Sequence, residues 1–578
     1  MQQNPNLGFN GAYSLTMAGW YGTAPAANFD FNYRNKKANI YGSIAASRRA
    51  QDQFVEFYRK VGYQNKITET NIHSERDPYQ LNFSARVGID YKLTQKTTIG
   101  LLASGYNNRW QMDAFNTSSF IVNGAKDSSI NISNQETNHW KHGMVNVNLT
   151  HALADGEISI NADYLHYYNA NPTDYTNQYF NPSLMPVYVS RLKSAKKTII
   201  DILPVQVDYR KKISSKAEIE TGVKGVFSTF TNNVLVASQQ QNLWVADSAF
   251  TANYLLKENI GAAYISVMVA ANTTNTIKAG LRYEYTFSNL GTEATKNIVD
   301  RKYGYFFPTF FWNHKINDNN SFTLSYNRRI NRPTFNNLAP FLIFIDPNTF
   351  ISGNAALQPS IADGAKADYT LKKFLFSVGY TTEQFTIGNF QVTVDNATNK
   401  QYLVAQNLTQ TQTINGLITL PFNIAKWWTS NININAEWQQ AKARYMSNPV
   451  NVNQFSYNIS GAQSFTLPKK ISAEISGFYN SASLFGITKI KPFGSLNVAL
   501  QKKFNNSSLK FGVDDIFSTM KFRFVADFPS QQFYTTSTIQ MSRSIFKLTF
   551  TKNFGNNILK EKRERITASD TERKRVTE

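Results

Sequence analysis

The chain has 578 residues, no cysteine, 42 phenylalanines and 30 tyrosines, and a formal net charge of +21. Without cysteine it has no disulfide framework, no thiolate nucleophile and no zinc–thiolate site. No apolar run approaches the roughly 18 residues of a membrane helix, and the lysines and arginines are scattered, which argues against nucleic-acid binding.

Alternation of apolar and polar residues predicts β-strands along almost the whole chain. The alternating segments include, in chain order, 9–17, 28–33, 145–150, 157–164, 321–327, 432–438, 496–501 and 546–554. In 321–327, Phe322, Leu324 and Tyr326 share one face, and Thr323 lies on the other. Because the polar faces are rich in Asn and Ser, we expect them to line water. The aromatic and aliphatic faces then need an apolar phase.

The connections between these strands alternate between short and long. The short turns are 34–37, 93–96, 153–156, 317–320, 425–428, 468–470 and 504–507. The long polar segments are 49–78, 113–134, 169–186, 234–249, 289–301, 332–361, 388–401 and 518–531. Such alternation is typical of a transmembrane antiparallel β-barrel with short periplasmic turns and long extracellular loops. The sequence therefore predicts an all-β barrel of about 22 strands.

The barrel is predicted to occupy residues 1–555, with its last strand at 546–554. Open sheet edges are not viable in lipid, so the last strand is expected to pair with the first. Residues 556–578 carry charges of both signs without an apolar period. They predict a charged, disordered periplasmic tail. The first residues, MQQNPNLGFNGAYSL, lack the pattern of a signal peptide.

Three stretches resemble a known family. They are TLSYNRRINRP with NLAPF and GNAALQP, then AGLRYEY (279–285) and FGVDDIFST (511–519). Together they resemble TonB-dependent outer-membrane transporters, and more narrowly the outer-membrane β-barrel family common in Bacteroidetes-type bacteria. Gly353, Asn354, Leu357 and Pro359 match the Gly-Asn-Pro-x-Leu-x-Pro element of that family, with Ala355 in place of its first proline.

The resemblance implies an integral protein of the bacterial outer membrane that takes up a large solute, such as a siderophore or an oligosaccharide. Family members usually carry a plug domain and an energy-coupling box before the first strand, and here the first strand begins almost at once. The implied partners are outer-membrane lipid and lipopolysaccharide, and the barrel-assembly machinery. A plug domain and the TonB energy-coupling complex are added if a missing N-terminal part supplies them. An open, passive porin-like channel and a soluble β-rich adhesin or scaffold are the alternatives.

The segment 332–361 is the candidate ligand-contact loop, because it mixes aromatic and polar residues between stiffening prolines. Its candidate ligand-binding residues are Arg332, Phe335, Phe341, Phe344, Asp346 and Asn348. The alternative is that these residues fold the loop over itself. We expect no catalytic residue, cofactor or metal site. His139 and His142, the closest histidine pair in HWKH, fall on opposite faces of a strand.

Overall fold

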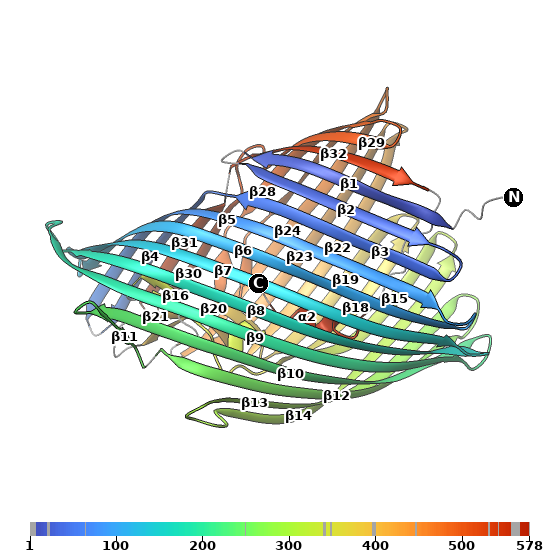
Figure 1. Ribbon diagram of the computed structural model, residues 1–578, viewed down its shortest axis with the longest axis horizontal. Coiled ribbons are helices and arrows are strands. Elements are labelled where there is room, and N and C mark those ends of the chain that lie inside the picture. Colours follow the sequence, from blue (N-terminus) through green and yellow to red (C-terminus); the bar gives the residue numbers. More distant parts are fainter. Residues whose placement is uncertain are drawn as a thin grey trace.

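The computed structural model describes residues 7–19, 23–63, 65–248, 250–338, 343–346, 349–395, 400–445, 448–529, 532–541, 543–556 and 567–576. The chain forms a closed antiparallel barrel of 22 strands (Figure 1). Its first strands are β1 (Gly8–Gly19), β2 (Ala24–Arg34), β3 (Ala38–Ala50), β5 (Lys66–Lys92), β6 (Thr97–Val122), β7 (Ala125–Ala152), β8 (Gly156–Phe180), β9 (Pro186–Lys212), β10 (Ala217–Gln240), β12 (Ala252–Ala270) and β13 (Asn275–Thr292). The others are β14 (Val299–Asn317), β15 (Asn320–Asn331), β18 (Ser360–Leu371), β19 (Phe374–Gln384), β22 (Gln410–Ala425), β23 (Trp428–Tyr445), β24 (Asn448–Leu467), β25 (Ile471–Asn480), β28 (Phe493–Lys503), β29 (Ser507–Asp514) and β32 (Ile545–Gly555).

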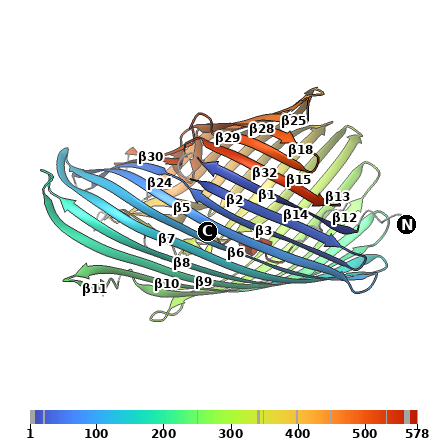
Figure 2. The ribbon, with the colours of Figure 1, turned by 45° about the horizontal axis from the view of Figure 1, so that its top comes forward.

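The barrel closes between its first and last strands, as predicted. β1 pairs antiparallel with β32, with Leu15 opposite Phe550 and Met17 opposite Leu548 (Figure 2). With this closure each of the 22 barrel strands pairs with a neighbour on both sides, which is the condition for a sheet in hydrocarbon.

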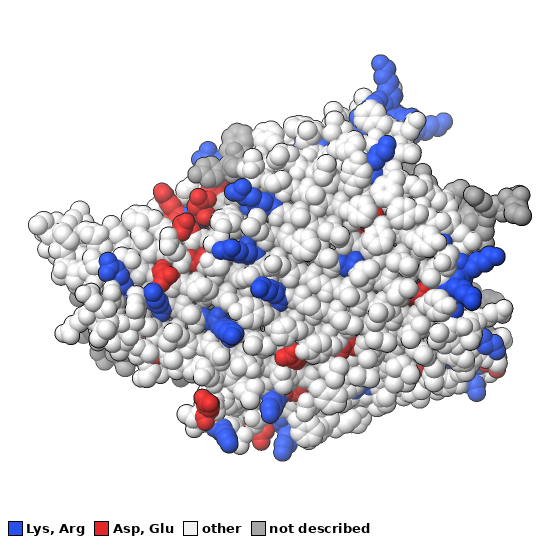
Figure 3. Space-filling model, in the orientation of Figure 1, with Lys and Arg blue, Asp and Glu red and all other residues white. Residues whose placement is uncertain are grey.

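The two faces of the wall differ as the alternation predicts. Leu15 and Met17 point outward and are 54% and 55% exposed. Leu324 and Tyr326 are also exposed on the outer face, whereas the Thr323 hydroxyl accepts a hydrogen bond from Asn313 on the inner face. Most of the outer face seen in Figure 3 carries no charge. An uncharged, apolar outer band is what contact with lipid requires.

The periplasmic end of the barrel is identified by its tight turns, and all seven predicted short turns lie there. At the other end, several of the predicted long segments are regular hairpins. Most of 113–134 and 169–186 continues the ladders of β6 with β7 and of β8 with β9. An inward-facing cluster of Phe120, Ile130, Ile132 and Tyr175 packs there. The hairpins therefore extend as sheet because their inner faces have apolar partners.

Six further strands extend the wall at the extracellular end. They are β4 (Gln53–Tyr63), β11 (Leu243–Ala246), β26 (Ser483–Phe485), β27 (Thr488–Ile490), β30 (Lys521–Phe528) and β31 (Phe533–Met541). β4 pairs with both β5 and β31, and β30 joins β31 to β27. The loops on this rim are thus tied to one another by backbone hydrogen bonds.

A second sheet lies inside the extracellular opening. It consists of β16 (Ile343–Asp346), β17 (Thr349–Ser352), β20 (Ile387–Asp395) and β21 (Lys400–Asn407). Thr349 accepts a hydrogen bond from Arg59 of β4, and Phe350 packs with Val234 and Val236 of β10. The sheet therefore contacts well-separated strands of the rim. Two short helices, α1 (Phe335–Leu338) and α2 (Asp570–Arg573), lie in the lumen, and no described helix could span a membrane.

Candidate functional site

Two chain segments fill one side of the lumen. The first is the luminal loop, residues 332–359, which joins β15 to β18 and contains α1, β16 and β17. The second is the C-terminal segment, residues 567–576, which contains α2. Both pack against the inner faces of β7, β8, β9, β10 and β12, which we call the packed wall.

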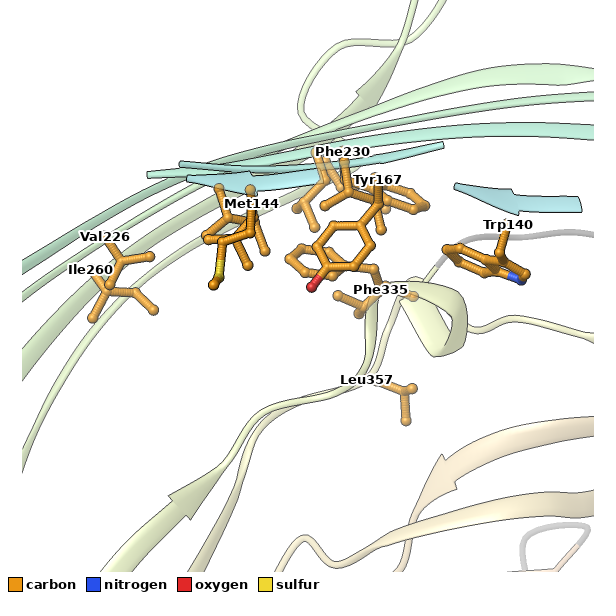
Figure 4. Packing of buried hydrophobic residues seen from close by; sticks show 14 of the residues in the cluster. Trp140, Met144, Tyr167, Val226, Phe230, Ile260, Phe335 and Leu357 are labelled. Carbon is orange, nitrogen blue, oxygen red and sulfur yellow. The ribbon is translucent and has the colours of Figure 1, made fainter. Parts of the chain in front are cut away.

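The luminal loop is held to the packed wall by an apolar cluster (Figure 4). Phe335 of α1 is stacked on Phe230 of β10, with ring centroids 5.6 Å apart and both rings fully buried. Leu165 of β8 and Leu357 of the loop are also fully buried in this cluster. Burial of such side chains contributes about 1.5–3 kcal/mol each relative to exposure. The two ends of the loop, around α1 and Leu357, are therefore packed against the wall.

Arg332 fixes the start of the luminal loop. Its guanidinium donates to Glu284 of β13 at 2.8 Å and to the Thr286 hydroxyl at 3.1 Å. Burial by itself would lower the pKa of Arg332, but the Glu284 carboxylate beside it raises that pKa above its ordinary value. Arg332 therefore stays charged and pairs with Glu284.

Asn354 and the backbone around Leu357, both in the family motif, hold the end of the loop. The Asn354 side chain donates to the Ala405 carbonyl at 3.0 Å and accepts from the Ala356 amide at 2.9 Å. Arg301 of β14 donates to the carbonyls of Ala356 and Leu357. Gly353 lies directly before Asn354, and Pro359 directly precedes β18. The motif thus ties the loop both to the barrel wall and to the second sheet.

The C-terminal segment departs from the predicted disordered tail. Residues 567–576 are placed inside the barrel (Figure 1), and Ala568, Ser569, Glu572 and Arg575 are buried. For these residues the expectation of a disordered periplasmic tail is corrected. The physical reason is that inward-facing charges of the wall provide partners that the tail sequence does not reveal.

Two ion pairs join this segment to the packed wall. Lys224 of β10 contacts Glu572 at 3.1 Å, and both side chains are about nine-tenths buried. Arg575 pairs with Glu258 of β12, also in a buried position. Removing one partner of such a pair leaves an uncompensated buried charge, which costs about 3–5 kcal/mol.

Hydrogen bonds place the beginning of the segment lower in the barrel. The Ser569 amide donates to the Asp163 carboxylate of β8 at 2.8 Å, and the same carboxylate accepts from Asn146 of β7. The Ser569 hydroxyl lies 3.9 Å from the sulfur of Met144. Asp163 and Met144 belong to the periplasmic third of their strands.

Arg575 also touches the luminal loop. Its Nε donates to the Pro333 carbonyl at 3.1 Å, and its guanidinium lies 4.6 Å from the centroid of the Phe335 ring. In return, the Phe335 amide donates to the Arg575 carbonyl at 3.1 Å. One side chain therefore connects the C-terminal segment, the wall and the candidate ligand loop.

The opposite inner wall differs in its chemistry. A hollow of about 290 Å³ there is lined by polar, small and aromatic residues of β23, β24, β25 and β28. Its side chains include Asn431, Asn433, Ser460, Ser476 and Asn497. Asn433 accepts a hydrogen bond from Thr419, and both it and Asn497 are half-buried. We call this region the open wall.

The structure describes four of the six candidate ligand-binding residues at the level of the backbone. Arg332 and Phe335 make the contacts given above, and Phe344 and Asp346 belong to β16. Phe341 and Asn348 fall outside the described residues. Sequence reasoning did not single out Asp163, Lys224, Glu258, Glu572 and Arg575. For Asp163, Lys224 and Glu258, the signal that could have identified them is a charged residue at an inward-facing position of a strand.

Other candidate chemistry is not assembled in the described part of the chain. His139 contacts Asn107 on the outer face, while His142 stacks on the luminal Tyr167 with centroids 4.0 Å apart. They lie on opposite faces, as predicted. The described residues contain no group of three His, Asp or Glu side chains placed to hold a metal ion.

The sequence matches the model of the outer membrane protein beta-barrel family over residues 151–551. The chain belongs to this family. It is therefore an integral protein of the outer membrane, and its strands cross that membrane. No curated protein sequence matches the chain.

Solved structures with the same fold are receptors and transporters. The copper transporter OprC has a TM-score of 0.62 at 11% identity, over 96% of this chain and 82% of that one. The ferric yersiniabactin uptake receptor FyuA from Yersinia pestis has a TM-score of 0.61 at 10% identity, over 96% and 81%. The siderophore receptor PirA from Pseudomonas aeruginosa has a TM-score of 0.56 at 11% identity, over 96% and 82%. At these identities the likeness concerns the fold.

Proposed function

We propose that the chain is the barrel of a TonB-dependent receptor that imports a bulky polar solute across the outer membrane. The observation that carries the proposal is the divided lumen. The packed wall is covered by the luminal loop and the C-terminal segment, and the open wall presents amide and hydroxyl groups. A barrel of this size encloses a lumen wide enough to require such an occupant.

This arrangement favours a gated receptor over a passive pore. A passive pore needs an unobstructed lumen, whereas here the second sheet lies in the extracellular opening and contacts β4 and β10. The candidate ligand loop is part of the obstruction, so that binding of a solute there can be linked to opening. The contacts described above serve to hold the loop and the segment in place, and we propose no enzymatic activity.

The proposed partners follow from the same geometry. A plug domain supplied by another part of the protein or by another chain would bring the TonB energy-coupling complex to the periplasmic end. Outer-membrane lipid and lipopolysaccharide surround the wall, and the barrel-assembly machinery inserts it.

The test is solute entry into liposomes that contain the folded barrel. We expect little conductance in planar bilayers, and slow entry of neutral oligosaccharides compared with an open porin of similar width. Cleavage of the luminal loop by protease added from the extracellular side should increase both the conductance and the rate of oligosaccharide entry. Large, steady conductance of the intact barrel would instead establish the passive channel.

A further inference from the structure

We propose that the packed wall carries a peptide-docking site, built from Asp163, Lys224 and Glu258, whose occupant is the C-terminal segment and can be withdrawn toward the periplasm. Docking holds the luminal loop in place, and withdrawal frees it. The inference rests on the proposed function, because it describes how that receptor is held shut.

The docking contacts are mainly polar. The segment uses the Ser569 amide, Glu572 and Arg575, and each meets an oppositely charged or hydrogen-bonding group of the wall. In a buried ion pair the Coulomb attraction is largely offset by desolvation of both charges. When the segment leaves, water in the lumen can hydrate Asp163, Lys224 and Glu258. The site is therefore suited to a reversible occupant.

The charge pattern of the site selects its peptide. Around the wall, from β8 through β10 to β12, the inward charges are the Asp163 carboxylate, the Lys224 ammonium and the Glu258 carboxylate. The segment answers with an amide donor, then an acidic and finally a basic side chain in Ser569, Glu572 and Arg575. A peptide with the acidic and basic side chains exchanged would place a cation beside Lys224 and a carboxylate beside Glu258.

Arg575 makes the segment a latch on the luminal loop. It is bound to Glu258 on the wall, and it also contacts Pro333 and Phe335 of the loop. Withdrawal of the segment removes two hydrogen bonds, from Arg575 to the Pro333 carbonyl and from the Phe335 amide to the Arg575 carbonyl. It also removes the Arg575 guanidinium from the face of the Phe335 ring. Phe335, a candidate ligand residue, then becomes accessible from the periplasmic side of the loop.

The direction of withdrawal follows from the course of the chain. β32 ends at Gly555 at the periplasmic end, where it pairs with the beginning of β1. The first wall contacts of the segment, at Met144 and Asp163, also lie in the periplasmic third. A pull from the periplasm therefore acts along the segment, while the latch to the loop lies at its far end.

A disulfide lock tests whether release is required for opening. The chain has no native cysteine, so that Met144→Cys with Ser569→Cys introduces the only pair, at side chains that already touch. The intact barrel is expected to open rarely, and the oxidised protein should open still less often in planar bilayers than the same molecules after reduction. The matched control is Asn497→Cys with Ser569→Cys. It places one cysteine on the open wall and one on the segment, and the two should not crosslink. Efficient crosslinking of the control pair, or equal openings before and after reduction, would overturn the proposal.

A second experiment tests the latch itself. A spin label on Gln358→Cys, an exposed loop position, reports loop mobility in the otherwise intact chain. Arg575→Ala should mobilise the label and raise the open probability by about tenfold or more, because a buried ion pair is lost. Lys574→Ala, the exposed neighbouring position, should change neither. An immobile label in folded Arg575→Ala protein would contradict the latch.

The two proposals can fail separately. If the lock controls conductance but no polar solute enters in any state, the proposed import function is wrong and the docking site stands. If solute enters at the same rate with the lock oxidised and reduced, import stands and the latch is wrong.

Discussion

The two inner walls of the barrel are built from the same alternating strands, yet they differ in what faces inward. On the packed wall, Leu165, Ile202, Phe230 and Leu256 point into the lumen and are at most 2% exposed. On the open wall the inward side chains include Asn431, Asn433, Ser460, Ser476 and Asn497. Apolar inward residues occur where the luminal loop and the C-terminal segment cover them. Strands that are apolar on both faces therefore indicate a luminal occupant.

The largest expected effect comes from a charge placed in the packed wall. Leu165→Arg buries an unpaired guanidinium, and we expect it to destabilise the folded protein by about 3–5 kcal/mol. Asn433→Arg on the open wall is the matched control and should cost much less, because water can reach it. The free energies of unfolding of both variants are measured by urea unfolding in detergent, with the folded fraction read from heat-modifiable mobility on gels. Equal costs would remove the distinction between the walls.

A smaller effect compares the outer face with the lumen. Leu324→Arg should cost about 2–4 kcal/mol if the residue lies near the midplane of the bilayer. Thr323→Arg, one residue earlier and facing the lumen, should cost clearly less. The two unfolding free energies are compared in lipid vesicles, where an outward charge meets hydrocarbon. A larger loss for Thr323→Arg would mean that the faces are assigned the wrong way round.

The family motif is expected to matter at an intermediate level. Asn354→Ala removes the hydrogen bonds to the Ala405 carbonyl and from the Ala356 amide, at a cost of about 1–3 kcal/mol. Because these bonds hold the luminal loop, protease cleavage within the loop should become faster. Asn354→Asp keeps the acceptor and loses the donor, so its effect should be smaller. An unchanged cleavage rate in Asn354→Ala would show that the motif does not anchor the loop.

The smallest effect is expected on the open wall. Asn433→Ala removes one half-buried hydrogen bond with Thr419 and should change stability by about 0.5 kcal/mol. The same change alters the amide lining, so that entry of a neutral oligosaccharide into liposomes should slow while that of a small ion is unchanged. A destabilisation as large as that of Asn354→Ala would show that the open wall is structurally packed after all.

The position of the candidate site was only partly accessible to sequence reasoning. The aromatic and polar mixture predicts the segment 332–361 as a ligand-contact loop, and its described residues before β18 lie in the lumen. Its contacts were not predictable, because Arg332 pairs with Glu284 on a strand 48 residues earlier. Nothing local in the sequence marks that partner. The binding role of its residues remains a prediction.

The sequence by itself determined the wall of this protein. Alternation assigns each strand residue to lipid or to the lumen, tight turns set the periplasmic end, and the need to pair every edge in hydrocarbon dictates closure of β1 on β32. These are local or general constraints, and they hold whatever fills the barrel.

Only the tertiary structure decided what occupies the lumen. Lys224 and Glu572 are 348 residues apart, and their pairing depends on a wall curved around a segment that has no helical or strand period of its own. Charges of both signs in residues 556–578 are equally compatible with a solvated tail. The difference is made by Asp163, Lys224 and Glu258, three inward charges that the closed barrel brings to one side.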